Sequence, residues 1–321
     1  MARLAAVAAA AALAAAGAAA AGAAPAAPLA PAPEVAVWSG SSSIVFGAAG
    51  RHGGIYLVRR DGSGLRRLTT AGGGDGGLAI SPDGRTVLFA SGGAIFRIGI
   101  DGTGLRRVTA GFSPSWSPDG RRIAFARNDG VYLARADGSG ARKLVTDRYP
   151  ESAAPTWSPA GDRVAYVACT APFLSRPCEH QYGFDLYTIR KTGSGKHRVT
   201  PRSGFPQCPS WSRAGRLAFL TEDATVAIVQ PSGRLRTFRP GGCPVWARGG
   251  GRLAVATATG ASLLGAGGGG RRRIAILPGS HTLFRSVAWS ADGTTLALVG
   301  GATRAHLYVA AANGSTRKRL L

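Results

Sequence analysis

Residues 114–146 read PSWSPDGRRIAFARNDGVYLARADGSGARKLVT, and this stretch decides the fold. It contains four short runs typical of β-strands. The turn signal SPDG (117–120) separates the first two runs, and DGSG (137–140) separates the last two. In both turns a Gly supplies the positive φ that a tight hairpin needs. Short runs punctuated in this way predict one four-stranded antiparallel sheet.

The same order of runs and turns recurs from Glu34 to the end of the chain. All six Trp residues occupy one slot, at the end of the first run, and Ile80 fills this slot in the remaining unit. A repeat of about 40–45 residues with four strands is typical of a propeller blade. We therefore predict an all-β fold, a seven-bladed β-propeller of four-stranded antiparallel blades over residues 34–321. The Trp residues are Trp38, Trp116, Trp157, Trp211, Trp246 and Trp289.

The second run of each unit is apolar on both faces. In the third unit Ile123 and Phe125 point one way, and Ala124 and Ala126 point the other. A strand with water on one side would alternate apolar and polar residues, so both faces are expected to be covered by neighbouring blades. We place the Trp slot between adjacent blades as well. The alternative, an aromatic platform for a ligand, is disfavoured because the placement is nearly identical in six units.

The phase of the repeat predicts how the ring closes. Each unit supplies all four strands of its own blade, from the innermost, which ends at the Trp slot, to the outermost. The last run, RKRLL (317–321), is then an outermost strand. Closure is expected to rest on packing between the first and seventh units, with some pairing by residues near Glu34.

The charge is strongly positive, with 39 Lys and Arg against 16 Asp and Glu, a net charge of +23. Such an excess attracts polyanions, for example an anionic envelope polymer, lipid headgroups or nucleic acid. Because the cations are spread over every unit rather than packed in one tract, a solvated basic surface is the competing interpretation. Specific nucleic-acid recognition is not predicted.

The N-terminus resembles an export signal. Residues 1–24 contain one early cation, Arg3, then an Ala-rich run and a small-residue A-x-A pattern at 21–23. This layout is typical of a cleaved signal peptide. Residues 25–33 form a Pro/Ala linker, which is expected to be extended. We predict a secreted or cell-envelope protein that is monomeric and has no transmembrane span after cleavage.

Four cysteines in an exported chain suggest disulfides. We favour Cys169–Cys178, which closes a short loop inside the fourth unit. Cys208–Cys243 would join two neighbouring blades, but their inner strands are expected to lie too far apart. Cys178–Cys208 is the alternative. No metal site is predicted, because neither C-x-x-C nor a close Cys/His pattern occurs.

The runs SPDGRRIAF (117–125) and GVYLARADGSGARKLVT (130–146) resemble the TolB-type propeller repeat. The resemblance covers about residues 34–321 and is weakest in the sixth unit. It implies a propeller fold, an envelope or secreted location and a protein-binding role. The propeller of TolB has six blades, so six is the alternative count. TolB also carries a further N-terminal domain, which this sequence is not expected to contain.

Strand order sorts the connections onto two faces. The SPDG and DGSG turns share one face, which we call the turn face. Connections between the second and third runs, and between units, share the other, which we call the loop face. Long loops on a rigid scaffold often bind ligands, so we expect the ligand surface on the loop face, centred on the fourth unit. The candidate residues are Arg148, Tyr149, Glu179, His180, Tyr182, Glu222 and Asp223.

No catalytic or cofactor motif stands out. There is no G-x-S-x-G elbow, P-loop or dinucleotide fingerprint. We therefore predict a binding module without catalysis and without a cofactor, whose partner is an envelope or extracellular protein or an anionic polymer. The alternative is a propeller lyase or hydrolase for an oligosaccharide or peptide, with Glu179, His180 and Glu222 at the channel mouth. Electrostatic adhesion to an anionic polymer is a third possibility, and predicts steep salt dependence.

Overall fold

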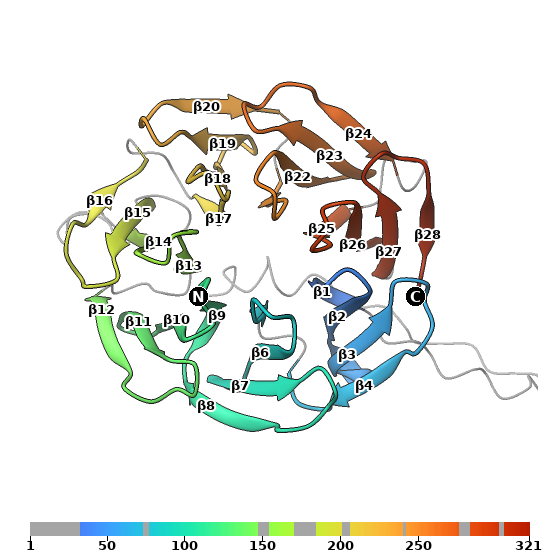
Figure 1. Ribbon diagram of the computed structural model, residues 1–321, viewed down its shortest axis with the longest axis horizontal. Coiled ribbons are helices and arrows are strands. Elements are labelled where there is room, and N and C mark those ends of the chain that lie inside the picture. The colour runs from blue at the N-terminus through green and yellow to red at the C-terminus, as the bar shows by residue number, and fades with distance from the viewer. Residues whose placement is uncertain are drawn as a thin grey trace, which may run out of the picture. The chain divides into compact units, whose positions relative to one another are not determined.

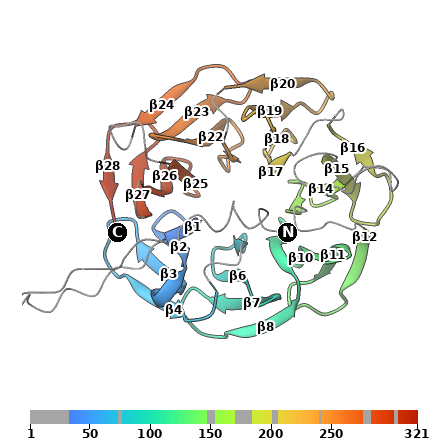
Figure 2. The same cartoon turned by 180° about the vertical axis from the view of Figure 1, so that it is seen from behind.

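The computed structural model contains seven four-stranded antiparallel sheets arranged as a ring (Figures 1 and 2). It describes residues 33–72, 77–146, 154–169, 184–200, 206–239, 242–275, 283–301 and 305–321. Each sheet is one blade and is built from four consecutive strands. The all-β prediction of seven blades is confirmed, and the alternative of six is wrong.

The strand bounds follow the repeat. Blade 1 also carries a short 3-10 helix, Gly50–His52, between its second and third strands. The blades comprise β1 (Pro33–Ser39), β2 (Ser43–Ala48), β3 (Gly54–Arg59) and β4 (Arg66–Thr69); β5 (Leu78–Ile80), β6 (Thr86–Ser91), β7 (Ala94–Gly99) and β8 (Arg106–Ala110); β9 (Phe112–Trp116), β10 (Arg122–Arg127), β11 (Gly130–Arg135) and β12 (Arg142–Thr146); β13 (Thr156–Trp157), β14 (Arg163–Cys169), β15 (Phe184–Arg190) and β16 (His197–Arg198); β17 (Gln207–Trp211), β18 (Leu217–Leu220), β19 (Val226–Val229) and β20 (Leu235–Phe238); β21 (Pro244–Trp246), β22 (Arg252–Thr257), β23 (Gly260–Gly265) and β24 (Arg272–Ala275); and β25 (Leu283–Trp289), β26 (Thr295–Gly301), β27 (His306–Ala311) and β28 (Arg317–Arg319).

The innermost strands form a closed cycle of contacts. β1 contacts β5, and the contacts continue through β9, β13, β17, β21 and β25 back to β1. β1 lies at the edge of its sheet and pairs with β2, while β28 lies at the edge of the last sheet and pairs with β27. Packing between the first and last blades therefore closes the ring, as predicted. The expected extra pairing near Glu34 is not found among the described strands, where β1 pairs with β2 alone.

The second strand of each blade is sandwiched between its neighbours. Ile123 and Phe125 pack with residues of blade 2 in one apolar cluster, whereas Ala124 and Ala126 pack with residues of blade 4 in another. All four side chains are fully buried. Blade 3 therefore presents large side chains to blade 2 and small ones to blade 4, which confirms that both faces of its second strand are covered.

The Trp slot joins neighbouring blades by hydrogen bonds as well as by packing. The indole N–H of Trp38 donates to the carbonyl of Ala288 at 3.1 Å, and that of Trp289 donates to Val245 at 2.9 Å. Trp116 makes the same bond to Ala79, at 3.3 Å. Each acceptor is the residue just before the Trp slot of the preceding blade. The indole nitrogens of Trp157, Trp211 and Trp246 are buried without a hydrogen-bond partner among the described residues.

A second repeated contact joins the blades at the rim. A cation of the outermost strand donates to a backbone carbonyl in the outer turn of the next blade. Arg66 donates to Asp101 at 2.8 Å, and Lys318 of the last blade donates to Asp61 of the first at 2.7 Å. The same contact links Arg142 to Lys191, Arg236 to Gly267 and Arg272 to Asn313. The closing seam thus has both the indole bond at the hub and the cation contact at the rim, as does the seam between blades 6 and 7.

Candidate functional site

Most of the predicted loop-face site lies outside the described residues. This holds for Arg148, Tyr149, Glu179, His180 and Tyr182, so their grouping stays a prediction. Glu222 and Asp223 are described, and both are exposed in the connection between β18 and β19 on the loop face.

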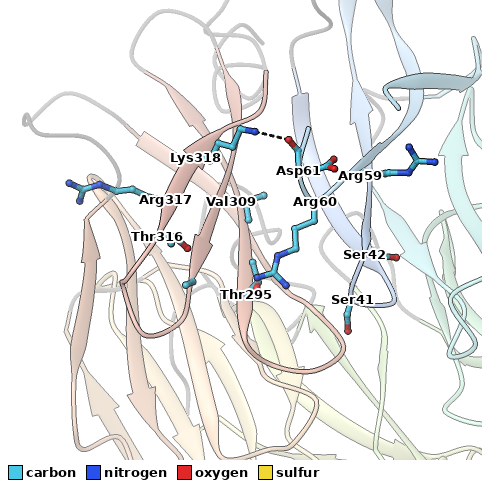
Figure 3. A pocket seen from close by; sticks show the side chains of 11 residues that line it. Ser41, Ser42, Arg59, Arg60, Asp61, Thr295, Val309, Thr316, Arg317 and Lys318 are labelled. Atoms are coloured by element: carbon cyan, nitrogen blue, oxygen red, sulfur yellow. Dashed lines mark hydrogen bonds between the residues drawn. The ribbon is translucent and has the colours of Figure 1, made fainter. Parts of the chain in front are cut away.

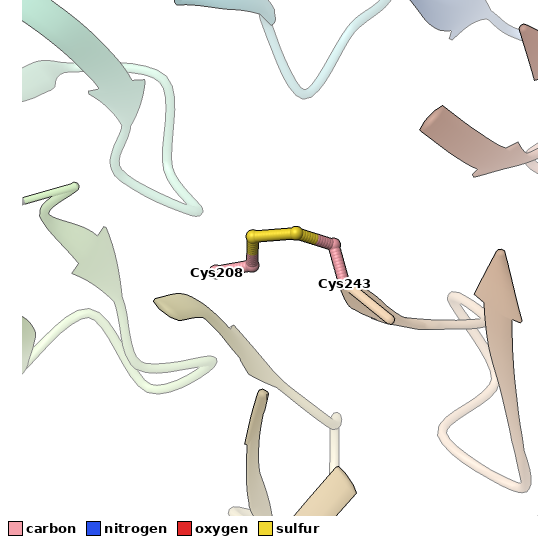
Figure 4. Close-up of a disulfide and its surroundings, with 2 residues drawn as sticks. All are labelled: Cys208 and Cys243. Atoms are coloured by element: carbon pink, nitrogen blue, oxygen red, sulfur yellow. A yellow bond between two sulfur atoms is a disulfide. The ribbon is translucent and has the colours of Figure 1, made fainter. Parts of the chain in front are cut away.

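The inner strands of blades 5 and 6 are joined by a disulfide. Cys208 and Cys243 pair with a Cα–Cα distance of 5.3 Å (Figure 4). The expectation that these positions lie too far apart was wrong, because the inner strands converge on the axis and β17 contacts β21. Cys208 also adopts a positive φ of 51° within an irregular stretch of β17. The pairing rules out the alternative Cys178–Cys208 bond.

Cys169 is disulfide-bonded too. It is the last residue of β14, at the loop-face end of blade 4. Cys178 lies outside the described residues, so the favoured pairing of these two cysteines stays a prediction.

The carboxylates of the turn face all hold turns. In the SPDG turn of blade 3, Asp119 accepts hydrogen bonds from the Ser117 hydroxyl and the Arg121 N–H. In blade 7 the hydroxyl of Ser290 and the N–H of Thr294 bind Asp292, and these bonds lower the pKa of that carboxyl to about 2. The same kind of turn is held by Asp61, Asp83, Asp101, Asp137 and Asp162.

Several cations of the turn face, among them Arg85, Arg121 and Arg234, form no ion pair with a described residue. The two ion pairs found among the described residues, Lys143–Asp129 and Arg198–Asp185, have their carboxylates at the loop-face ends of blades 3 and 4. Every blade adds an exposed cation to the turn face, so this face is basic all round the ring. Examples, one per blade, are Arg60, Arg85, Arg121, Lys191, Arg234, Arg248 and Arg317.

A groove of about 580 Å³ opens on the turn face at the seam between blades 7 and 1 (Figure 3). Blade 1 contributes the β1–β2 turn and the start of the β3–β4 turn. Blade 7 contributes the turn-face ends of β26, β27 and β28. The walls carry basic side chains and the hydroxyl groups of Ser and Thr residues. The lining residues are Ser41, Ser42, Arg59, Arg60, Asp61, Thr295, Val309, Ala311, Thr316, Arg317 and Lys318.

A smaller cavity of about 250 Å³ lies near the axis on the same face. Its walls include the rings of Trp38, Trp246 and Trp289. The guanidinium of Arg248 in blade 6 donates to the carbonyl of Pro82 in blade 2, at 2.7 Å, and so bridges two blades that are not neighbours.

Sequence analysis placed the ligand surface on the loop face and missed the seam groove. Two departures from the repeat mark it. Blade 1 has SGSS (39–42) where other blades have a turn such as SPDG, and blade 7 has Thr295 where blade 6 has Arg252.

Among the described residues, no helix is long and apolar enough to cross a membrane. Nor do three or more metal-binding side chains gather anywhere in this part of the chain.

Residues 32–215, more than half of the chain, match the family model described as "TolB beta propeller domain". Comparison with curated proteins gives no match.

Several solved structures share the fold. TolB from Acinetobacter baumannii is 15% identical, with a TM-score of 0.50 over 83% of this chain and 58% of its own. A puromycin-hydrolyzing peptidase from Mycobacterium tuberculosis is 15% identical, with a TM-score of 0.68 over 89% of this chain and 52% of its own. The β-propeller domain of the Trilobed protease from Pyrococcus furiosus is 12% identical, with a TM-score of 0.65 over 91% of this chain and 98% of its own. At these identities the likeness concerns the fold, and the chain spans little more than half of the first two proteins.

Proposed function

The chain belongs to the TolB beta propeller domain family, and we propose that it is an exported binding module, without catalysis, for an acidic protein or anionic polymer of the cell envelope. The observation that carries this proposal is the basic turn face. Its carboxylates are occupied by turn hydrogen bonds. Exposed cations such as Arg85, Arg121 and Arg234 form no ion pair with a described residue, so they can bind a partner. A surface of one sign draws an oppositely charged partner and speeds its association.

Two further observations support the location and the mode of action. The Cys208–Cys243 disulfide suits an oxidising compartment outside the cytosol. The ring is tied at the hub by indole hydrogen bonds and at the rim by cations, which gives a rigid platform. A rigid platform binds with little loss of conformational entropy.

The proposal is tested by binding to two defined polyanions, polyglutamate for an acidic protein and polyglucuronate for an anionic polymer. Fluorescence anisotropy of labelled polymers with the exported chain gives affinity as a function of salt. Binding of at least one polymer, falling steeply between 50 and 200 mM salt, is expected because each neutralised anion releases counterions.

Matched double variants locate the surface. Arg85→Glu with Arg234→Glu alters exposed cations of the turn face in blades 2 and 5, and is expected to weaken binding. Arg51→Glu with Arg239→Glu makes the same charge change in connections of the loop face. Equal loss in both double variants would mean that net charge alone drives binding, and would contradict the proposal. Shortening of either polymer during incubation, measured by mass spectrometry, would contradict a role without catalysis.

A further inference from the structure

The groove at the seam between blades 7 and 1 has a threonine where the neighbouring seam has an arginine. At the neighbouring seam, Arg252 of blade 6 donates to the carbonyl of Gly293 in blade 7 at 2.7 Å. Its guanidinium lies over the Trp289 ring, 5.3 Å from the centroid. Arg252 immediately precedes Leu253, which pairs with Trp246, the Trp-slot residue of blade 6. The corresponding residue of blade 7 is Thr295, which is too short to cross the seam.

The opposite wall is also made of small residues. Ser41 and Ser42 form the β1–β2 turn of blade 1 and line the groove. The Arg60 side chain enters from the same blade and runs toward Thr295 (Figure 3). The result is a hollow of about 580 Å³, within the range of sites for small ligands.

Arg60 is the charged group best placed to bind a ligand there. Its guanidinium has no hydrogen bond or ion pair with a described residue, and the side chain is exposed. The one carboxylate of the groove, Asp61, accepts hydrogen bonds from the N–H and hydroxyl of Ser63 instead. Lys318 donates to the Asp61 carbonyl through one of the three N–H groups of its ammonium. The groove therefore has a net positive charge and spare donors.

The remaining lining favours a sugar over a simple anion. Ser42 and Thr316 are exposed residues with hydroxyl groups. Ser41 lines the groove beside them, and its hydroxyl is engaged by Asp292, whose N–H it accepts at 3.2 Å and whose carboxylate it also binds. Hydroxyls both donate and accept, as sugar hydroxyls do, whereas phosphate at neutral pH mainly accepts. Val309 and Ala311 supply an apolar patch for the C–H groups of a ring.

We propose that the seam groove binds a uronate unit of an acidic polysaccharide. The planar Arg60 guanidinium matches a carboxylate with two parallel hydrogen bonds. The hydroxyls of Ser42 and Thr316 bind those of the sugar. This inference rests on the proposed function, since it names one class of anionic partner and one anchoring site for it on the turn face.

The test measures binding of a β-1,4-linked glucuronate trimer to the full chain by titration calorimetry. Cellotriose, which has the same linkage and lacks the carboxylates, is the ligand control, and inorganic phosphate is the anion control. The trimer is expected to bind, and both controls to bind at least tenfold more weakly. Equal binding of cellotriose or of phosphate would overturn the proposal.

Two variants locate the site. Arg60→Gln is expected to weaken trimer binding about tenfold or more, because it removes a charge-assisted pair. Ser42→Trp is expected to abolish binding by filling the groove. Arg51→Gln, on the loop face of blade 1, is the matched control and is expected to bind normally. Unchanged melting temperatures verify that each variant is folded. Normal trimer binding by both Arg60→Gln and Ser42→Trp would overturn the inference.

The two proposals fail separately. If the Arg85→Glu and Arg234→Glu double variant loses polymer binding while Arg60→Gln changes nothing, the groove is not the anchor and the proposed function stands. If the trimer binds in the groove while neither long polymer binds the chain, the broader turn-face proposal is wrong and the groove assignment stands.

Discussion

The indole N–H of Trp38 in the first blade donates to the carbonyl of Ala288 in the last blade, across 250 residues of sequence. Both residues lie on innermost strands, β1 and β25. At the same seam the Ala291 N–H donates to the Gly40 carbonyl and Lys318 donates to the Asp61 carbonyl. Hydrogen bonds and packing therefore close the ring, and no sheet of the described residues contains strands from both blades. The bond from Trp289 to Val245 has the same geometry at an ordinary seam.

Trp38→Phe should destabilise the protein by about 1 kcal/mol more than Trp246→Phe does. Both substitutions replace a buried indole by a smaller ring, but only Trp38 has a hydrogen bond to lose. The loss leaves the Ala288 carbonyl without its donor. Denaturant unfolding of the two variants measures the difference, and equal losses would show that the bond contributes nothing to closure.

Removal of the Cys208–Cys243 bond should lower stability by roughly 2–4 kcal/mol in the chain-entropy account, since it closes a loop of 35 residues between neighbouring blades. The variant with both cysteines changed to serine would be compared with the native chain in thermal melts, with and without reductant. Reductant should lower the melting temperature of the native chain more than that of the variant. An unchanged melting temperature in the oxidised variant would contradict this account.

Asp292→Asn should remove a pH dependence of stability. The bonds from Ser290 and Thr294 lower the pKa of Asp292 from 3.8 to about 2 in the folded protein. A depressed folded pKa gives stability that is complete above pH 3.8 and is lost as the pH falls toward 2. Unfolding midpoints of the two proteins should differ above pH 4 and converge near pH 2. A constant difference across this range would show that the carboxylate charge is not involved.

The loop-face hypothesis predicts that Tyr149, His180 and Tyr182, replaced together by Ala, abolish binding of a protein partner and leave melting unchanged. The reason is that long loops on a rigid scaffold present side chains without supporting the core. Pull-down from envelope fractions with the native chain and the triple variant measures the effect. Partner recovery by the triple variant would contradict the loop-face hypothesis.

The blade count, strand order and closure followed from the sequence because each blade repeats the same turn residues and the same Trp slot. The distance between Cys208 and Cys243 could not be predicted from the sequence, because a repeat gives the order of strands but not their distance from the axis. The acceptors of the indole bonds are backbone carbonyls, which no side-chain pattern reveals. Two sequence features lie at the seam groove, SGSS in blade 1 and Thr295 in blade 7. They indicate a groove only once it is known that Arg252 spans the neighbouring seam.

Each sheet consists of consecutive residues only, and this has a consequence for how such rings change in evolution. Duplication or deletion of one unit of about 40 residues adds or removes a complete blade and disturbs just the two seams beside it. In a ring whose ends share a sheet, the same event near a terminus would also break a β-ladder. Homologous chains of this construction can therefore differ by whole blades while every remaining sheet keeps its hydrogen bonds.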